Sequence, residues 1–195
     1  MNSTASSLSP ASPLLLEQRS LPWQIMAVIT GSLLLALSSY IEVPMIPVPM
    51  TMQTYVVVLI GALYGWRLGA ITVLTWLGQA AVGLPVLSGG SGGALAFIGP
   101  TAGYLFSFPI VAALVGWLAQ RGWNGQHIAL AFSAALVGHG LCLMLGAAWL
   151  TTLMSTKAAM AAGVTPFILG AILKSALAAA TLKLLSRRRI TTLAR

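Results

Sequence analysis

Residues 83–93 read GLPVLSGGSGG and residues 99–104 read GPTAGY, and both stretches lie in a segment, between Arg67 and Arg121, that contains no charged side chain. About 20 apolar residues cross a hydrocarbon core of ~30 Å, so this segment is long enough for two crossings and a link between them. Glycine and proline at this density end a helix. Because an unsatisfied peptide group costs several kcal/mol in hydrocarbon, we expect the link to be either a folded loop or part of a pocket wall.

The composition of the whole chain supports the same interpretation. Of the 195 residues, 58% are hydrophobic and 6% are charged, and the only acidic residues are Glu17 and Glu42. These values are typical of an all-α integral membrane protein. The formal net charge of +8 would suggest a nucleic-acid partner in a soluble domain. Here the basic residues are spread over chain ends and short loops, so they report topology in the lipid bilayer and predict no nucleic-acid partner.

Six apolar runs, separated by helix-breaking residues, predict six transmembrane helices. Their approximate ranges are 23–42, 52–65, 69–84, 99–119, 127–151 and 164–186. The second run is short for a crossing, and we expect it to recruit part of 47–52 or of 65–69. With six crossings, Arg19, Arg67, Arg121 and the basic C-terminal residues fall on one side. The positive-inside rule assigns that side, and with it both termini, to the cytoplasm.

The predicted domain organisation has three parts. We expect a disordered cytoplasmic tail over residues 1–20, a six-helix substrate-binding domain over 21–187, and a basic cytoplasmic tail over 188–195. The first apolar run could instead belong to a cleaved signal, because it contains the small-residue triplet Ala36-Leu37-Ser38, but the run is long enough to span a membrane. The chain contains no Walker A pattern, so we do not expect it to hydrolyse ATP by that route.

Small residues recur at every fourth position in the early runs, a spacing that lets helix backbones approach closely in lipid. One series consists of Gly61, Gly65 and Gly69, which we interpret as packing within the chain. A second series, in the first run, consists of Ala27, Gly31, Ser32 and Ala36. For this second series, internal packing and a docking face for a partner protein remain equally open.

The segment after the first run, residues 43–50, reads VPMIPVPM. Its prolines, Pro44, Pro47 and Pro49, fix φ and exclude a helix, which leaves a stiff extended segment. Such a segment suits a gating loop over a cavity, and it is equally compatible with an ordinary ordered loop.

Lys174 is the strongest candidate for a binding residue, because it lies near the middle of the last apolar run. A lysine at the centre of a membrane helix costs about 2.5–3.5 kcal/mol, and such a cost is typical of a functional residue. The position three residues earlier on the same helix face is Ala171, so no carboxylate neutralises the lysine there. The expected counter-ion is a ligand carboxylate or, as a second choice, Glu42. The alternative is that the side chain extends to the membrane interface.

Several other polar residues lie within or beside the apolar runs. They are Gln53, Gln79, Ser91, Thr101, Tyr104 and His139. Each of them could also be a simple interhelical hydrogen-bonding residue, worth about 0.6 kcal/mol on average. We interpret His139, which lies between two glycines, as structural, and Cys142 as a small packed residue. A single cysteine gives no disulfide and no metal-ligand spacing.

The sequence of residues 89–93 satisfies the pattern G-x-S-x-G, with Ser91 at its centre. Together with His139, this serine could form the dyad of an intramembrane serine protease of the rhomboid type. Glycine-rich loops satisfy the pattern by chance, so we keep the protease only as a remote alternative.

Three stretches together resemble the BioY family, the biotin-binding S components of energy-coupling factor (ECF) transporters. They are residues 46–54, with the sequence IPVPMTMQT, residues 78–93, which contain GLPV at 83–86, and residues 99–104. The resemblance is specific because three separate motifs occur in order. The motifs cover about 46–118, and the six-run layout extends the match over most of the chain.

The resemblance implies a six-helix S component in the bacterial cytoplasmic (inner) membrane, with an outward-opening biotin pocket and a first outer loop that controls access. It also implies association with a transmembrane coupling subunit and two ATPase subunits, with the small-residue face of the first helix as docking surface, and transport by tilting of the whole S component. In that family the last helix commonly carries an acid three residues before a lysine near the ligand. This chain keeps Lys174 but has Ala171 at the position of the acid.

We therefore expect a membrane protein for biotin uptake, with no catalytic activity, cofactor or metal of its own. The biotin carboxylate is expected to pair with Lys174, and its rings to lie against Tyr104. The expected contacts of the ureido group and the rest of the ligand are Gln53, Ser91, Gly92, Gly93 and Thr101. An S component for another small carboxylate vitamin is the alternative within transport, since Ala171 departs from the family pattern.

Overall fold

The computed structural model describes residue 14 and residues 16–193, and it describes side chains as far as Ser186. Most of the tail predicted over 1–20, and the last two residues of the tail predicted over 188–195, lie outside the described residues. The described part contains seven α-helices, which are α1 (Leu21–Ser39), α2 (Gln53–Tyr64), α3 (Trp66–Ala81), α4 (Ala102–Gln120), α5 (Ile128–Leu150), α6 (Thr156–Gly163) and α7 (Phe167–Leu193). A two-stranded antiparallel hairpin pairs β1 (Glu42–Val43) with β2 (Met50–Thr51).

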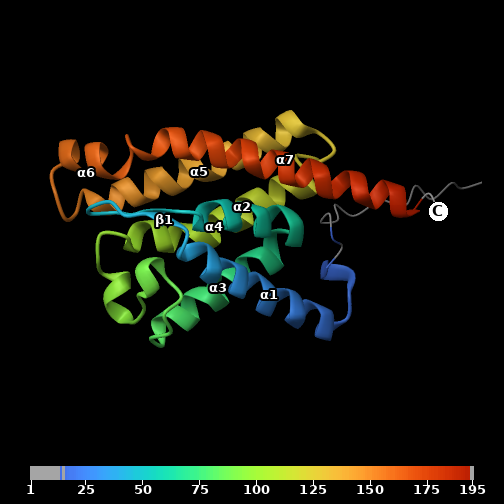
Figure 1. Ribbon diagram of the computed structural model, residues 1–195, viewed down its shortest axis with the longest axis horizontal. Coiled ribbons are helices and arrows are strands. Elements are labelled where there is room, and N and C mark those ends of the chain that lie inside the picture. Colours follow the sequence, from blue (N-terminus) through green and yellow to red (C-terminus); the bar gives the residue numbers. More distant parts are fainter. Residues whose placement is uncertain (1–13, 15, 194–195) are drawn as a thin grey trace, which may run out of the picture.

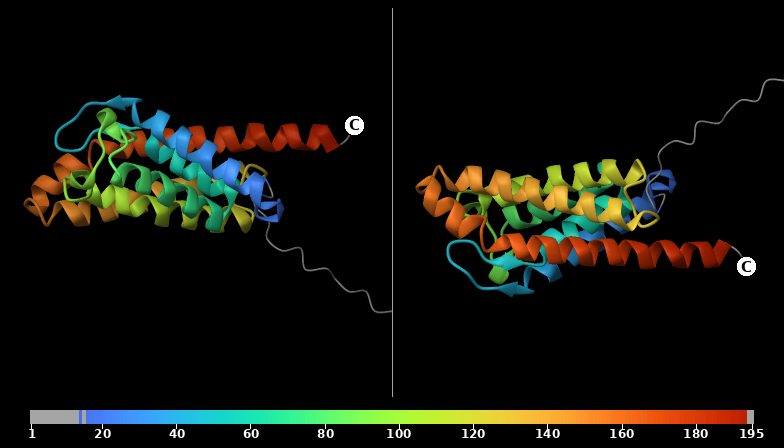
Figure 2. Two further views of the ribbon diagram at one scale, coloured as in Figure 1. Left: turned by 90° about the horizontal axis from the view of Figure 1, so that it is seen from below. Right: turned by 90° about the horizontal axis from the view of Figure 1, so that it is seen from above.

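The helices lie side by side along the long axis of the molecule, and Figure 1 shows α2 and α4 in the middle, between α1 and α3 on one side and α5 and α7 on the other. Successive helices reverse direction, so the connections gather at two ends (Figures 1 and 2). The loop end carries residues 40–52, 82–101 and 151–166. The terminal end carries the connections at 65 and 121–127 and both ends of the described chain.

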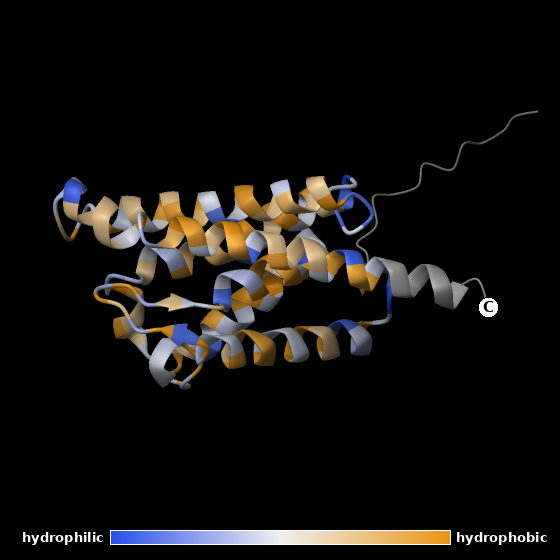
Figure 3. Cartoon of the chain, turned by 45° about the horizontal axis from the view of Figure 1, so that its top comes forward, coloured by the Kyte–Doolittle hydropathy of each residue, from blue (hydrophilic) through white to orange (hydrophobic). Residues whose placement is uncertain are grey.

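Four helices, α1, α4, α5 and α7, are long and apolar enough to cross a membrane. Their bounds agree with the predicted runs to within a few residues, apart from the extension of α7 to Leu193. Figure 3 shows hydrophobic residues along the helices and hydrophilic ones gathered mainly toward the two ends. At the terminal end the guanidinium groups of Arg67 and Arg121 lie over the rings of Trp66 and Trp117, 4.9 and 3.7 Å from the ring centroids. Cations and aromatic rings together are typical of a membrane interface.

The second and third predicted runs differ from the structure at their junction. Helix α2 has 12 residues and does not recruit 47–52, which belong to the hairpin, or 65–69, which belong to the junction and to α3. Gly65 alone connects the two helices, with φ of 85° and its N–H donating to the carbonyl oxygen of Gly61 at 3.0 Å. A residue with a side chain rarely adopts such a φ, so glycine makes the one-residue turn possible. The expected extension of the second run is therefore wrong.

The glycine series in α2 and α3 packs within the chain, as predicted. A Cβ atom at Gly61 would collide with the backbone of Ala112 in α4, and one at Gly69 would lie 3.1 Å from the Cα of Gly61. A Cβ at Gly116 of α4 would lie 2.6 Å from the backbone nitrogen of Trp66. These contacts between backbones fix α2, α3 and α4 against one another near the terminal end.

The small-residue face of α1 is covered by the chain itself. Gly31 and Ser32 are buried, and a Cβ at Gly31 would lie 2.6 Å from the side chain of Thr72 in α3. Ala27 and Ala36 are half-buried against the same core. These contacts favour internal packing for Gly31 and Ser32, because their small side chains let α1 approach α3. A docking role for the face with Ala27 and Ala36 stays a prediction.

Candidate ligand-binding site

A cavity of about 460 Å³ lies at the loop end of the bundle. Its walls come from α2, α4, α5 and α7, from the hairpin segment 47–51, and from residues 87–101 of the long loop. A volume of this size is typical of small-molecule sites, which are mostly apolar with a few placed polar groups. Of the residues predicted from the sequence to bind a ligand, the following line the cavity: Gln53, Ser91, Gly92, Thr101, Tyr104 and Lys174.

Lys174 lies in the cavity wall and is partly buried. Its Nζ donates hydrogen bonds to the carbonyl oxygen of Thr51 at 2.5 Å and to Oγ1 of Thr54 at 3.2 Å. Both acceptors are neutral, so they solvate the ammonium group without neutralising it. The side chain points into the protein, which contradicts the alternative that it extends to the membrane interface.

The two acidic residues of the chain are engaged elsewhere. Glu42 accepts a hydrogen bond from the hydroxyl of Ser88, and Glu17 accepts one from Gln120 at 3.1 Å near the terminal end. The second-choice counter-ion, Glu42, is therefore not paired with Lys174. Among the residues that the structure describes, the lysine has no carboxylate partner, and a cavity with an unneutralised cation favours an anionic ligand.

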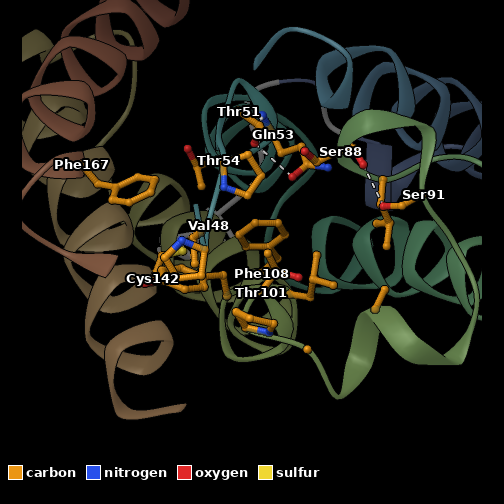
Figure 4. A pocket seen from close by; sticks show the side chains of 18 of the residues that line it. Val48, Thr51, Gln53, Thr54, Ser88, Ser91, Thr101, Phe108, Cys142 and Phe167 are labelled. Atoms are coloured by element: carbon orange, nitrogen blue, oxygen red, sulfur yellow. Dashed lines mark hydrogen bonds between the residues drawn. The ribbon is translucent and has the colours of Figure 1, made fainter. Parts of the chain in front are cut away.

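Gln53 begins α2 and is 4% exposed. Its Oε1 accepts a hydrogen bond from the hydroxyl of Thr51 at 3.0 Å, whereas its Nε2 has no partner among the described residues. Figure 4 shows Thr51, Gln53 and Thr54 grouped on one side of the cavity, with Phe167 approaching from another. A buried amide without a partner is costly, so this donor suits a polar group of a ligand.

Aromatic side chains supply the apolar part of the wall. Tyr104 is buried, and its hydroxyl donates to the carbonyl oxygen of Gly163 at 2.7 Å. Its ring lies 6.3 Å from that of Phe167, and Phe108 lines the cavity one turn further along α4. Because the hydroxyl of Tyr104 is already bonded, this residue offers a ligand its ring face.

His139 joins α5 to α7 inside the protein. Its Nδ1 lies 2.8 Å from the carbonyl oxygen of Ala135 and 3.1 Å from Oγ of Ser175. For Nδ1, these contacts agree with the interpretation of His139 as a structural residue. The other nitrogen, Nε2, is buried and has no partner among the described residues, and the residue lines the cavity.

The serine-protease alternative is wrong. The hydroxyl of Ser91 donates to the carbonyl oxygen of Ser88 at 2.7 Å, and the hydroxyl next to His139 is that of Ser175. Ser91 follows a short 3-10 turn, Ser88–Gly90, in the middle of a loop. The strand-turn-helix that exposes the serine of a G-x-S-x-G motif is therefore missing at this position.

The glycine-rich loop contributes less of the cavity wall than its sequence suggests. Gly92 lines the cavity, and a Cβ there would collide with the backbone of Leu84. Gly93 does not line it, because its N–H turns away and donates to the carbonyl oxygen of Ala80 at 2.7 Å. Two tryptophans hold the loop to the helices, since Nε1 of Trp76 and of Trp149 donate to carbonyl oxygens of the loop at 3.1 and 2.9 Å.

The proline-rich segment lies beside the same cavity. Pro47 and Pro49 line it, and Pro44 does not. Two side-chain bonds connect residues just before this segment to the long loop. The hydroxyl of Ser88 donates to Glu42, and the hydroxyl of Tyr40 donates to the carbonyl oxygen of Pro85 at 2.5 Å. The two loop segments beside the cavity are thus bonded to each other.

Comparison with known proteins assigns a family to this fold and site. The model of the BioY family matches residues 11–191. The chain belongs to the BioY family. It is 39% identical over 148 residues to the biotin transporter BioY of Rhizobium etli, covering 71% of this chain and 78% of the relative. It is 34% identical over 145 residues to the probable biotin transporter BioY of Pyrococcus horikoshii, covering 74% and 85%.

A solved structure agrees with the BioY assignment. The crystal structure of an S component for biotin from an ECF-type ABC transporter matches with a TM-score of 0.73 at 24% identity, over 88% of this chain and 94% of that one. This likeness shows that the fold is that of an S component. Together with the apolar helices, the family makes this BioY protein a multi-pass membrane protein.

Some residues of the cavity in this BioY protein were not predicted from its sequence. They include Thr51, Thr54, Phe108 and Phe167. Phe108 could have been found, because it lies four residues after Tyr104 and so on the same helix face. Thr51 and Thr54 flank Gln53, but only the position of Lys174 on a distant helix makes them important.

Proposed function

We propose that this protein captures biotin from outside the cell and delivers it through an ATP-driven ECF transporter as the S component. The observation that carries the proposal is the ammonium group of Lys174 in the cavity wall, which has only neutral partners among the described residues. An anionic ligand would neutralise it. The names of the relatives, of which the chain covers about four fifths in length, support biotin as that ligand.

In the proposed complex the biotin carboxylate pairs with Lys174 and displaces one of its neutral partners. The bicyclic ring lies against the rings of Tyr104 and Phe108, and the cavity is large enough to enclose most of a ligand of this size. Further contacts come from Gln53, Ser91, Gly92 and Thr101, which line the same cavity. Gly93 contributes only to the shape of the loop.

The proposed arrangement in the membrane has six crossings within residues 21–187 and both termini in the cytoplasm of a bacterial cell. The positions of the charged residues support it, because Arg19, Arg67 and Arg121 lie at the terminal end, whereas Glu42 and Lys157 lie at the loop end. The cavity then opens to the outside of the inner membrane, covered by the segment with Pro44, Pro47 and Pro49. The proposed partners are a transmembrane coupling subunit and two ATPase subunits.

A second small carboxylate vitamin remains a candidate ligand, and one observation favours it. Ala171 lines the cavity one turn before Lys174, so a methyl group faces the ligand where the family commonly has an acid. The loss of that acceptor would reduce affinity for any ligand that donates a hydrogen bond there.

Binding of radiolabelled biotin to the purified protein tests the proposal. Unlabelled biotin should compete fully, and biotinol, in which the carboxylate is replaced by an alcohol, should compete much more weakly because it lacks the charge that pairs with Lys174. Absence of biotin binding would overturn the proposed ligand. Equal competition by biotinol would show that Lys174 does not pair with the carboxylate. The isolated chain should hydrolyse no ATP in the same preparation.

A further inference from the structure

His139 lines the cavity, and one nitrogen of its imidazole ring has no hydrogen-bond partner among the described residues. This nitrogen is Nε2, and the residue is 3% exposed. Leaving a buried polar atom unpaired costs about 1–3 kcal/mol, so a histidine that served only to join α5 and α7 would be a poor choice at this position. The unpaired atom therefore points to a ligand.

The surrounding hydrogen bonds determine what this nitrogen can do. The hydroxyl of Ser175 donates its proton to the carbonyl oxygen of Ala171 at 2.7 Å, so toward Nδ1 of His139 the oxygen can only accept. The carbonyl oxygen of Ala135, 2.8 Å from the same nitrogen, also can only accept. Nδ1 must therefore carry the proton, and in the neutral ring Nε2 is an acceptor.

His139 and Lys174 line the same cavity from different helices. The ammonium group of Lys174 reaches the start of α2, where it donates to Thr51 and Thr54. The imidazole of His139 lies against α7, with Nδ1 3.1 Å from Oγ of Ser175. A ligand in this cavity can therefore meet the two groups with different polar atoms.

We infer that Nε2 of His139 accepts a hydrogen bond from a ureido N–H of biotin, so that this histidine selects the ring system while Lys174 binds the carboxylate. The inference rests on the proposed function and names the contact that would recognise the neutral end of the ligand. It also provides an acceptor for that end in a chain with no acid at position 171, since the imidazole lies next to Ser175, whose hydroxyl is bonded to the carbonyl oxygen of Ala171.

The first test compares two ligands on two variants. His139→Phe keeps a ring of similar size and removes the acceptor, and His127→Phe, at the exposed other histidine, is the matched control. His139→Phe should lower biotin affinity about tenfold to a hundredfold, the equivalent of about 1–3 kcal/mol, and His127→Phe should not. Biotin methylated on both ureido nitrogens should bind the wild type weakly, and His139→Phe should bind it no worse than the wild type does.

The pattern of results separates the possible failures. If His139→Phe loses affinity equally for biotin and for the methylated analogue, His139 only supports the fold. If His139→Phe binds biotin as the wild type does, His139 does not contact the ligand. Both results would overturn the inference. If the wild type itself does not bind biotin, the proposed function fails before the role of His139 is reached.

A second test leaves His139 itself unchanged. The chain contains two histidines, so nitrogen NMR of protein labelled with ¹⁵N-histidine gives two sets of ring signals, which His127→Phe assigns. In the protein without ligand, His139 should carry its proton on Nδ1, and biotin should shift the Nε2 signal toward that of an acceptor in a hydrogen bond. A proton on Nε2 before binding, or an Nε2 signal that biotin leaves unchanged, would overturn the inference.

Discussion

Helix α4 has close backbone neighbours near the terminal end and a cavity near the loop end. Toward the terminal end, a Cβ added at Gly61 of α2 would collide with the backbone of Ala112, and one added at Gly116 would collide with the backbone of Gly65 and Trp66. At the loop end, Tyr104 and Phe108 line the cavity. The distance between packed helices follows the size of the side chains between them. Small residues thus bring α4 close to α2 and α3 near the terminal end, and aromatic residues of α4 line the cavity near the loop end.

This difference predicts that substitutions at the two ends will change different measured quantities. Changes at the terminal end should lower the stability of the fold and leave ligand affinity intact. Changes in the cavity should lower affinity and leave stability intact, because the polar groups there are kept at a cost to the fold.

The largest expected effect is that of Lys174→Met on biotin binding. Removing the ammonium group leaves the ligand carboxylate without a charge partner, so affinity should fall by about 2–5 kcal/mol. The melting temperature should stay the same or rise, since the fold no longer buries a cation. Calorimetric titration and thermal unfolding measure the two quantities, and Lys157→Met, on the exposed surface of α6, is the control. Equal losses of affinity and stability would contradict the separation of the two ends.

Gly116→Ala is expected to have a smaller effect, which lowers the stability of the fold and leaves biotin affinity unchanged. Its Cβ would lie 2.6 Å from the nitrogen of Trp66 and 2.7 Å from the carbonyl carbon of Gly65, and overpacking of this kind costs about 1–3 kcal/mol. The folded fraction should bind biotin as the wild type does. Gly140→Ala is the matched control, because a Cβ on that helical glycine meets nothing within 4 Å. Equal stability of the two variants would show that the backbones at the terminal end can move apart freely.

The smallest effect concerns the bond between Ser88 and Glu42, which connects the loop segments beside the cavity. Glu42→Gln and Ser88→Ala should each raise the release rate of biotin about fivefold, equivalent to about 1 kcal/mol, with little change in melting temperature. Because the two groups are partners, the double variant should release biotin no faster than either single one. Stopped-flow displacement measures the rates, with Glu17→Gln as control. Additive effects would show that the two side chains act independently.

The long helices could be predicted from the sequence because hydrophobicity and helix breakers are local signals. The junction of α2 and α3 could be predicted as a break between residues 65 and 69, but its one-residue length could not, because only the φ of Gly65 reveals so tight a turn. The pairing of Glu42 with Thr51 also has no local signal. It depends on two short segments meeting in space.

The candidate site could be predicted in part for a related reason. Lys174 could be recognised as a candidate because a charged residue in an apolar run is costly in any arrangement of the helices. The role proposed for His139 is not visible in the sequence, since the lack of a partner for its Nε2 depends on how the helices pack around it. The small residues of α1 were ambiguous because the same spacing serves contacts within a chain and between chains.

The one-residue turn at Gly65 also has a consequence for how the protein enters the bilayer during synthesis. Helix α2 is about 18 Å long, too short to be held across a hydrocarbon core of ~30 Å by itself. With no loop to separate it from α3, it cannot be released into lipid as an independent segment. We therefore expect residues 53–81 to insert as a single helical hairpin, with one fewer insertion step than the number of apolar runs suggests.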